Sequence, residues 1–282
     1  MKKLKLLFLP FLLCLFCVFP LGCNEKEPTG SKGLEFIENV GGKSYAVQNI
    51  GTCDDEKVVI PKTYKGKPVT RVYDRAFKGA DTIEEVVLPE GLLYIDKLAF
   101  SECINLQSVK IPSTVKELGG SSFAGCENLQ SVTFAKGCVL EKIGGSSFDG
   151  CTSLTEFEVP SSVQEVGSYA FQNCTALEEI TFLEGATYSP ETYAQWNGCV
   201  NLKKAYLPGT FQKMSWATFQ GCTSLEIVFV GTKQEFATLD RYYNRNSNGP
   251  FWAATHYIYS EEEPRESGRF WHYVKGKMTI WE

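Results

Sequence analysis

Residues 119–126 read GGSSFAGC, a stretch whose residue types could support three kinds of chemistry. Paired glycines can bring backbone N–H groups close to a phosphate, and a serine or cysteine can act as a nucleophile. The specific motifs are absent, because no lysine follows the glycines and no glycine closes a nucleophile elbow. The nearly identical GGSSFDGC at 144–151 is a second copy that a catalytic loop rarely needs. The stretch is therefore predicted to be structural.

Metal binding and histidine-dependent catalysis are also disfavoured. The chain contains only two histidines, His256 and His272, and no C-x-x-C pair after residue 22. A cysteine–histidine pair would have to use Cys53 or Cys138, and nothing in the local sequence supports one. We predict that the protein is not an enzyme and has no catalytic residues, no metal and no cofactor.

Carboxylates are the remaining catalytic candidates. A glycosidase needs two carboxylates that face each other across a cleft. The strand-like segments instead carry glutamates that would lie on one sheet as an acidic surface: Glu84, Glu85, Glu156, Glu158, Glu178 and Glu179. The formal net charge of −5 also argues against a nucleic-acid partner, which requires clustered lysine and arginine.

An internal repeat organises the middle of the chain. Its marker aromatics are spaced 23, 23, 25, 23, 25 and 23 residues apart. They are Phe77, Phe100, Phe123, Phe148, Phe171, Trp196 and Phe219. Such regularity indicates stacked coils that bury their apolar faces against one another. Each coil is expected to contain a strand, a second short extended piece, and a corner at the aromatic formed by a helical turn.

The repeat pattern C-x-x-L-x-x-V-x-I-P-x-x-V-x-x-I-x-x-x-A-F resembles the BspA-like leucine-rich repeats of bacterial surface proteins. The resemblance covers about residues 35–282. It implies a leucine-rich repeat solenoid, mainly β with short helical turns, of about seven stacked coils of 23–25 residues. The expected parts are an N-terminal cap at 35–75, the solenoid at 76–230, a C-terminal cap at 231–260 and an aromatic tail at 261–282, which reads as a small hairpin.

The N-terminal residues indicate export. Three lysines precede an apolar run from Leu6 to Phe19, which has the build of a signal peptide, so residues 1–22 are assigned to one. The run ends in PLGC, which resembles a bacterial lipoprotein signal and makes Cys23 the expected site of lipidation and the membrane anchor. Residues 23–34 would then form the lipidated tether. The expected location is the cell surface or the outer face of a membrane, and the alternative is ordinary cleavage and secretion.

The eight remaining cysteines are expected to be free thiols. Six of them occupy one repeat position, three residues after the aromatic, where neighbouring coils would place them side by side. Parallel neighbours about 4.8 Å apart do not offer disulfide geometry. Small buried residues suit this position, and a free cysteine is one of them. Cys53 and Cys138 are expected to lie outside this row and to be the most reactive thiols.

The outward side of the strands is the best candidate for a binding site. The candidate residues on this face are Glu156, Glu158, Glu178, Glu179, Lys203, Lys204, Tyr206 and Phe229. Aromatic residues beside charges are typical interface anchors, although the C-terminal cap could cover Phe229 and the acidic part could be a solvated surface. The resemblance implies non-enzymatic binding or adhesion to an extracellular protein or glycan. The alternative is a structural spacer or assembly partner in the cell envelope.

Overall fold

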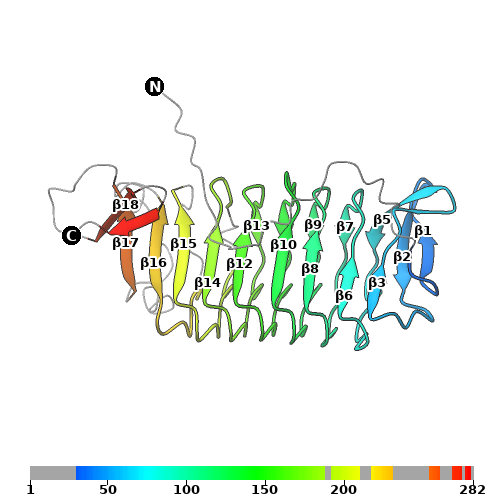
Figure 1. The fold of residues 1–282 in the computed structure, drawn as a ribbon, viewed down its shortest axis with the longest axis horizontal. Helices are drawn as coiled ribbons and strands as arrows, with labels where there is room; N and C mark the ends of the chain where they lie inside the picture. The colour runs from blue at the N-terminus through cyan, green and yellow to red at the C-terminus, as the bar shows by residue number, and fades with distance from the viewer. Residues whose placement is uncertain are drawn as a thin grey trace, which may run out of the picture.

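The computed structural model describes residues 30–187, 192–209, 217–230, 254–260, 269–274 and 277–280. These residues wind into β-coils that stack along one long axis, with β1 at one end and β17–β19 at the other (Figure 1). The predicted signal peptide, Cys23 and most of the predicted C-terminal cap lie outside the described residues. None of the described residues forms a helix, so none forms one that is long and apolar enough to cross a membrane.

Two kinds of strand alternate along the repeats, because each coil contributes one longer and one shorter strand. The first part of the chain forms β1 (Glu35–Glu38), β2 (Tyr45–Asn49), β3 (Lys57–Val59), β4 (Thr63–Tyr64), β5 (Lys67–Val72), β6 (Glu85–Val87), β7 (Tyr94–Ile95), β8 (Ser108–Ile111), β9 (Glu117–Leu118) and β10 (Ser131–Phe134). The second part forms β11 (Lys142–Ile143), β12 (Glu156–Val159), β13 (Glu165–Val166), β14 (Glu179–Phe182), β15 (Lys204–Pro208), β16 (Glu226–Val230), β17 (Thr255–Tyr259), β18 (Phe270–Val274) and β19 (Lys277–Ile280).

The strands form sheets on two sides of the coils. The short strands β7, β9, β11 and β13 continue a sheet that starts with the longer strands of the lead-in, in the order β1-β2-β5-β7-β9-β11-β13, and β4 pairs with β5. The longer strands build two sheets, β10-β8-β6-β3 and β12-β14-β15-β16-β17-β18-β19. Neighbouring coils pair in parallel throughout, as a solenoid requires, and the tail strands β18 and β19 pair antiparallel as a hairpin. The side facing between the sheets is apolar and forms one continuous core.

The lead-in segment is itself a coil. Ile50 N–H donates to the Ala76 carbonyl, just as Phe77 N–H donates to that of Ala99 in the next coil. Cys53 N–H closes the same turn onto the Ile50 carbonyl at 3.1 Å. Ile50 therefore takes the aromatic position and Cys53 the thiol position. The prediction that Cys53 lies outside the thiol position was wrong. This coil has an aliphatic residue where the other coils have an aromatic one, so the spacing of the aromatics did not reveal it.

The corners at the aromatics are tight turns, so the expected helical turns are absent from the described repeats. Each corner contains two residues with positive φ, one two residues before the aromatic and one two residues after it. In the coil of Phe148 these are Ser146, with φ of 54°, and Gly150, with φ of 74°. Residues with positive φ cannot continue a right-handed helix, so no helical turn forms at the corner. The chain instead reverses its direction in a tight turn of a few residues.

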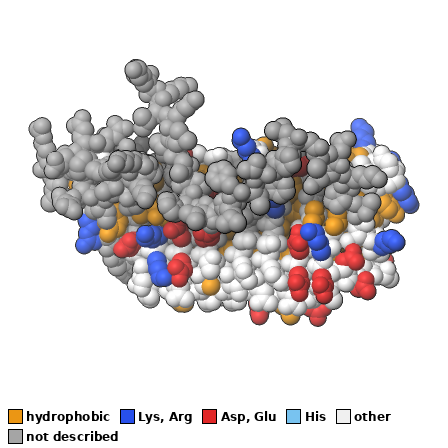
Figure 2. Space-filling model, viewed as in Figure 1, with side chains coloured by type: hydrophobic (Ala, Val, Ile, Leu, Met, Phe, Trp, Pro, Cys, Tyr) orange, Lys and Arg blue, Asp and Glu red, His pale blue; other side chains and the backbone are white. Residues whose placement is uncertain are grey.

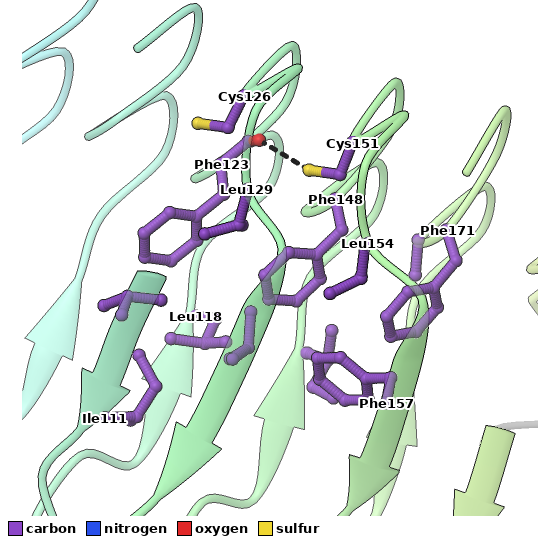
Figure 3. Packing of buried hydrophobic residues seen from close by; sticks show 14 of the residues in the cluster. Ile111, Leu118, Phe123, Cys126, Leu129, Phe148, Cys151, Leu154, Phe157 and Phe171 are labelled. Carbon is purple, nitrogen blue, oxygen red and sulfur yellow. Dashed lines mark hydrogen bonds between the residues drawn. The ribbon is translucent and has the colours of Figure 1, made fainter. Parts of the chain in front are cut away.

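The aromatic residues form a stack along the core. Consecutive rings lie nearly parallel, with centroids 5.5 Å apart between Phe123 and Phe148 and 5.3 Å apart between Phe148 and Phe171 (Figure 3). Both flanking rings of Phe148 are fully buried, and so is Phe148 itself. Burial of one such side chain contributes about 2–3 kcal/mol to the free energy of unfolding. Each ring also contacts the next, so the stack couples neighbouring coils.

The repeated cysteines form a row of thiols beside the aromatic stack. The thiol of Cys151 donates to the Phe123 carbonyl of the preceding coil at 3.2 Å (Figure 3). Equivalent bonds of 3.0–3.4 Å are made by Cys103, Cys126, Cys174, Cys199 and Cys222. All eight described cysteines are free, as predicted. Burial raises the pKa of each thiol in this repeated row, and that of Cys103 reaches about 12. These thiols are protonated and unreactive at neutral pH.

Substituting two glycines of one coil should separate close packing from backbone conformation. A Cβ on Gly144 would lie 2.7 Å from the backbone of Gly119, whereas a Cβ on Gly150 would meet only ordinary contacts at 3.8 Å. We expect Gly144→Ala to lower the free energy of unfolding by about 3 kcal/mol, because backbone atoms must move apart. Gly150→Ala should lower it by about 1–2 kcal/mol, the penalty of a left-handed alanine. Urea denaturation measures both, and a smaller loss for Gly144→Ala would contradict the close stacking.

Cys138 should be the first described cysteine to react in the folded protein, because it is only partly buried while the other seven are buried. Burial raises its pKa, so the rate of maleimide modification should keep rising as the pH passes 8.5, the usual range for a thiol. Peptide mass spectrometry of the labelled protein locates the modification. Cys138→Ser should remove the fast reaction, and equally fast labelling of Cys151 without denaturant would show that the thiol row is accessible.

Candidate binding faces

The second serine of GGSSFAGC is part of the core. Ser122 and its counterpart Ser147 in the next coil are both fully buried. The Ser147 hydroxyl donates to the carbonyls of Gly119 at 3.0 Å and Gly144 at 2.7 Å, so it ties two coils together. Cys126 belongs to the thiol row. The functional candidates are therefore the outward sides of the sheets.

The predicted strand face is assembled by the parallel register of β12, β14, β15 and β16. Glu156, Glu179, Lys204 and Glu226 are register partners in consecutive strands, so their side chains form one row. A second row joins Glu158, Thr181, Tyr206 and Val228. Most of the predicted face residues lie outside the core. Glu156, Glu158, Glu178 and Lys203 are exposed, whereas Glu179, Lys204 and Tyr206 are half-buried.

Phe229 does not belong to this face. Alignment on the cysteines pairs it with Tyr206, but its register partner is Leu207, and Phe229 is fully buried. Leu225 is followed at once by β16, whereas one additional residue, Lys203, separates Leu202 from β15. This one-residue difference turns Phe229 inward, because successive strand residues point to opposite sides.

Charges on the strand face are only partly neutralised. Lys203 forms an ion pair with Glu178 at 2.8 Å, and Lys204 lies near Glu179. Burial raises the pKa of Glu179, the Lys204 ammonium opposes this shift, and the Glu156 carboxylate adds to it. The pKa of Glu158 is also raised, by partial desolvation and then by Glu156. Repulsion thus concentrates on β12, whose two carboxylates form no ion pair with any described residue.

The opposite sheet carries a different charge pattern. Lys142 lies between two register partners, with its ammonium 3.8 Å from the carboxylate of Glu117 and 3.3 Å from that of Glu165. Farther along the same sheet, Arg71 pairs with Asp96 at 2.7 Å and lies over the ring of Tyr94. The sequence analysis did not identify this face. The short strands have two residues each in most coils, too few to show an alternating pattern.

No metal centre is formed by the residues that the structure describes, because they contain no group of three or more histidine, cysteine and carboxylate side chains suited to a metal ion. Cys53 lies in the first coil, whereas His256 and His272 belong to β17 and β18 at the other end of the stack. Charged side chains of both signs are interspersed over the visible surface, rather than gathered into one continuous basic patch (Figure 2).

Similar solved structures share the solenoid architecture. A leucine-rich repeat protein of T. pallidum is 21% identical, with a TM-score of 0.55, and the match covers 79% of this chain and 96% of that chain. The pneumococcal vaccine antigen PcpA is 18% identical, with a TM-score of 0.48, over 72% of this chain and 65% of that chain. The first of these likenesses supports the fold. No curated protein matches the sequence.

The repeat sequence matches a described family directly. The profile of the BspA type leucine-rich repeat region matches in 6 copies, over residues 51–139, 70–191 and 137–248. These overlapping matches extend over more than half of the chain, and they cover the coils whose aromatic and thiol positions were described above. The chain belongs to the BspA-type leucine-rich repeat family.

Proposed function

We propose that the protein is a non-enzymatic binding module for an extracellular protein or glycan, and that the strand face of β12, β14 and β15 is its contact surface. The repeat scaffold supports this, because solenoids present long regular surfaces on which side chains vary without disturbing the core. Several hydroxyls and thiols of the repeats are shielded from a substrate. Ser122 and Ser147 are buried, and so is the row of repeated cysteines.

The observation that carries the proposal is the uncompensated negative charge on β12. Glu156 and Glu158 face outward and have no ion-pair partner among the described residues, and the pKa of Glu158 is raised by partial burial and, second, by the neighbouring Glu156 carboxylate. On the opposite sheet, Lys142 is placed between two glutamates and offsets part of their charge. A cationic partner would relieve the repulsion on β12 and gain electrostatic attraction. This favours a basic segment of a protein over a neutral glycan at this face.

The location proposed for this module is the cell surface or the outer face of a membrane, with Cys23 lipidated. Residues 1–22 have the composition of a signal peptide, and PLGC supplies the cysteine at its end. Residues 24–29, NEKEPT, are polar and include a proline, as suits a tether that holds the solenoid away from the lipid. The predicted tether of residues 23–34 was too long, because Ser31 N–H donates to the Val59 carbonyl and Leu34 is buried in the core. Secretion after ordinary cleavage is the alternative.

A structural role in the envelope is the second candidate function. Stacked coils make an elongated spacer, and β18 and β19 extend a sheet beyond the repeats. Such a role predicts no binding to soluble proteins and a stable association with another envelope protein.

Removing the two carboxylates of β12 should weaken binding of a basic protein without destabilising the fold. The full-length protein is applied to an array of purified extracellular matrix proteins and glycans. For a basic protein hit, Glu156→Gln/Glu158→Gln should lower affinity about tenfold, and the effect should shrink at high salt. Binding should also weaken as the pH falls through the raised pKa of Glu158, because protonation removes the charge.

The matched control is Glu141→Gln, an exposed glutamate outside this face. It should bind like the wild type. The free energy of unfolding of the double variant should not fall at pH 7, because a raised pKa means that the folded state disfavours the charged form there. Unchanged affinity of the double variant would exclude this face, and a specific glycan hit that the double variant loses would replace the protein partner. The structural role would be supported if the protein bound nothing on the array and one envelope protein co-purified with it.

Lipidation predicts that Cys23 carries a fatty acid. Cells expressing the protein and fed an alkyne fatty acid should yield labelled protein, and Cys23→Ser should abolish the label and release the protein from the membrane fraction. Cys138→Ser is the control and should leave the label unchanged. Absence of label on the wild-type protein would favour ordinary cleavage and secretion.

A further inference from the structure

A hollow of about 510 Å³ lies on the short-strand side, where β5, β7 and β9 run into their corners. Its volume falls within the roughly 300–1,000 Å³ that small-molecule sites occupy. Arg71, Tyr94 and Glu117 line it from the strands, and the corners that follow add Asp74, Asp96 and Lys97. This site lies on the sheet opposite the acidic face of β12, so it is independent of the function proposed above.

Two adjacent glycines, Gly119 and Gly120, form part of the wall of the hollow. The N–H groups of Asp96 and Gly119 donate to the carbonyls of Val72 and Ile95, which places these two residues at the same position of successive coils. At Gly119 a Cβ would lie 2.6 Å from the Asp96 carbonyl carbon, so no other residue fits there without movement. Gly120 follows Gly119 and also lines the hollow. The backbone of the two glycines in the GGSS stretch therefore lines the hollow opposite the polar side chains of the two preceding coils.

The cationic part of the wall is held in a fixed position. The Arg71 guanidinium donates to Asp96 at 2.7 Å and lies 4.5 Å from the centroid of the Tyr94 ring. An arginine has five N–H donors, so these two contacts orient it and leave donors for a ligand. Lys97 is exposed beside it and provides an ammonium.

The acidic part of the wall contains an acceptor with no partner. One oxygen of Asp74 accepts a hydrogen bond from Arg75, while the other, Oδ1, is buried and has no hydrogen-bond partner. A buried acceptor without a donor is unfavourable by about 1–3 kcal/mol. The side chain as a whole is 37% exposed, and Asp74 lines the hollow.

The combination of groups specifies the ligand chemistry. The hollow offers acceptors at Asp74 and Glu117, donors at Arg71 and Lys97, and an aromatic ring at Tyr94. A guanidinium or ammonium ligand only donates hydrogen bonds and would face two cations. A phosphate only accepts and would face three carboxylates, those of Asp74, Asp96 and Glu117. Sugar hydroxyls both donate and accept, and they carry no charge. We propose that this hollow binds a neutral sugar residue of a glycan.

Saturation-transfer NMR on the full-length protein, kept in a detergent without sugar, tests the proposal. The probes are glucose, galactose, mannose and N-acetylglucosamine, with arginine amide and inorganic phosphate as charged competitors. At least one sugar should give a signal. Asp74→Ala should weaken its binding about tenfold by removing the acceptor. Gly120→Leu should abolish binding by filling the hollow.

Gly145→Leu is the matched control for the filling variant. Gly145 occupies the same repeat position one coil later, and a Cβ there would meet a backbone carbonyl at 3.1 Å, much as one on Gly120 would at 3.3 Å. The control lies outside the hollow and should bind sugar like the wild type, while urea denaturation checks that both leucine variants are folded. Glu156→Gln/Glu158→Gln should also leave sugar binding unchanged, which separates this site from the acidic face. The proposal would be overturned if none of the four sugars gave a signal or if a charged probe bound instead. It would also be overturned if Asp74→Ala and Gly120→Leu bound sugar as well as the wild type.

Discussion

Backbone hydrogen bonds between neighbouring coils are the constraint on which the structure depends. Each coil must present its N–H and C=O groups to the next at the spacing of parallel strands, about 4.8 Å. That spacing stacks like residues on like, so Phe123 lies on Phe148 and the thiol of Cys151 reaches the carbonyl of Phe123. It also leaves no room for a Cβ at Gly144, which lies against the backbone of the preceding coil. Repetition in the sequence is the consequence of this geometry.

The same constraint directs function to the outside of the coils. Interior positions are restricted to residues that can stack, and buried groups among them, such as the Ser147 hydroxyl and the Cys151 thiol, donate to carbonyls of the preceding coil. Side chains at outward positions can differ from one coil to the next, because they do not have to stack in the core. On the short-strand sheet Lys142 lies between two glutamates and offsets part of their charge, whereas on β12 the carboxylates of Glu156 and Glu158 form no ion pair with any described residue. Two sheets of one scaffold thus offer chemically different surfaces.

The position of a residue within its coil explains which sequence predictions were confirmed and which were wrong. The aromatic and cysteine spacings predicted the solenoid and the thiol row, because each coil repeats the same side-chain environment. Cys53 was misplaced because Ile50 replaces the aromatic of its coil. Phe229 was misplaced because β16 begins one residue sooner after its leucine, and a shift of one residue exchanges the two sides of a strand. Neither change alters the composition of the repeat, so spacing alone could not show it.

The sequence by itself determined the family, the coil length and the identity of the core positions, because a periodic stack requires a periodic pattern. It also indicated the acidic character of the β12 face, since alternation within one strand is local. Only the tertiary structure decided which residues of different coils meet. Asp74 and Gly120 are 46 residues apart, yet both line one hollow. The glycines of GGSSFAGC matter because stacking places their bare backbone beside charged side chains from the two preceding coils.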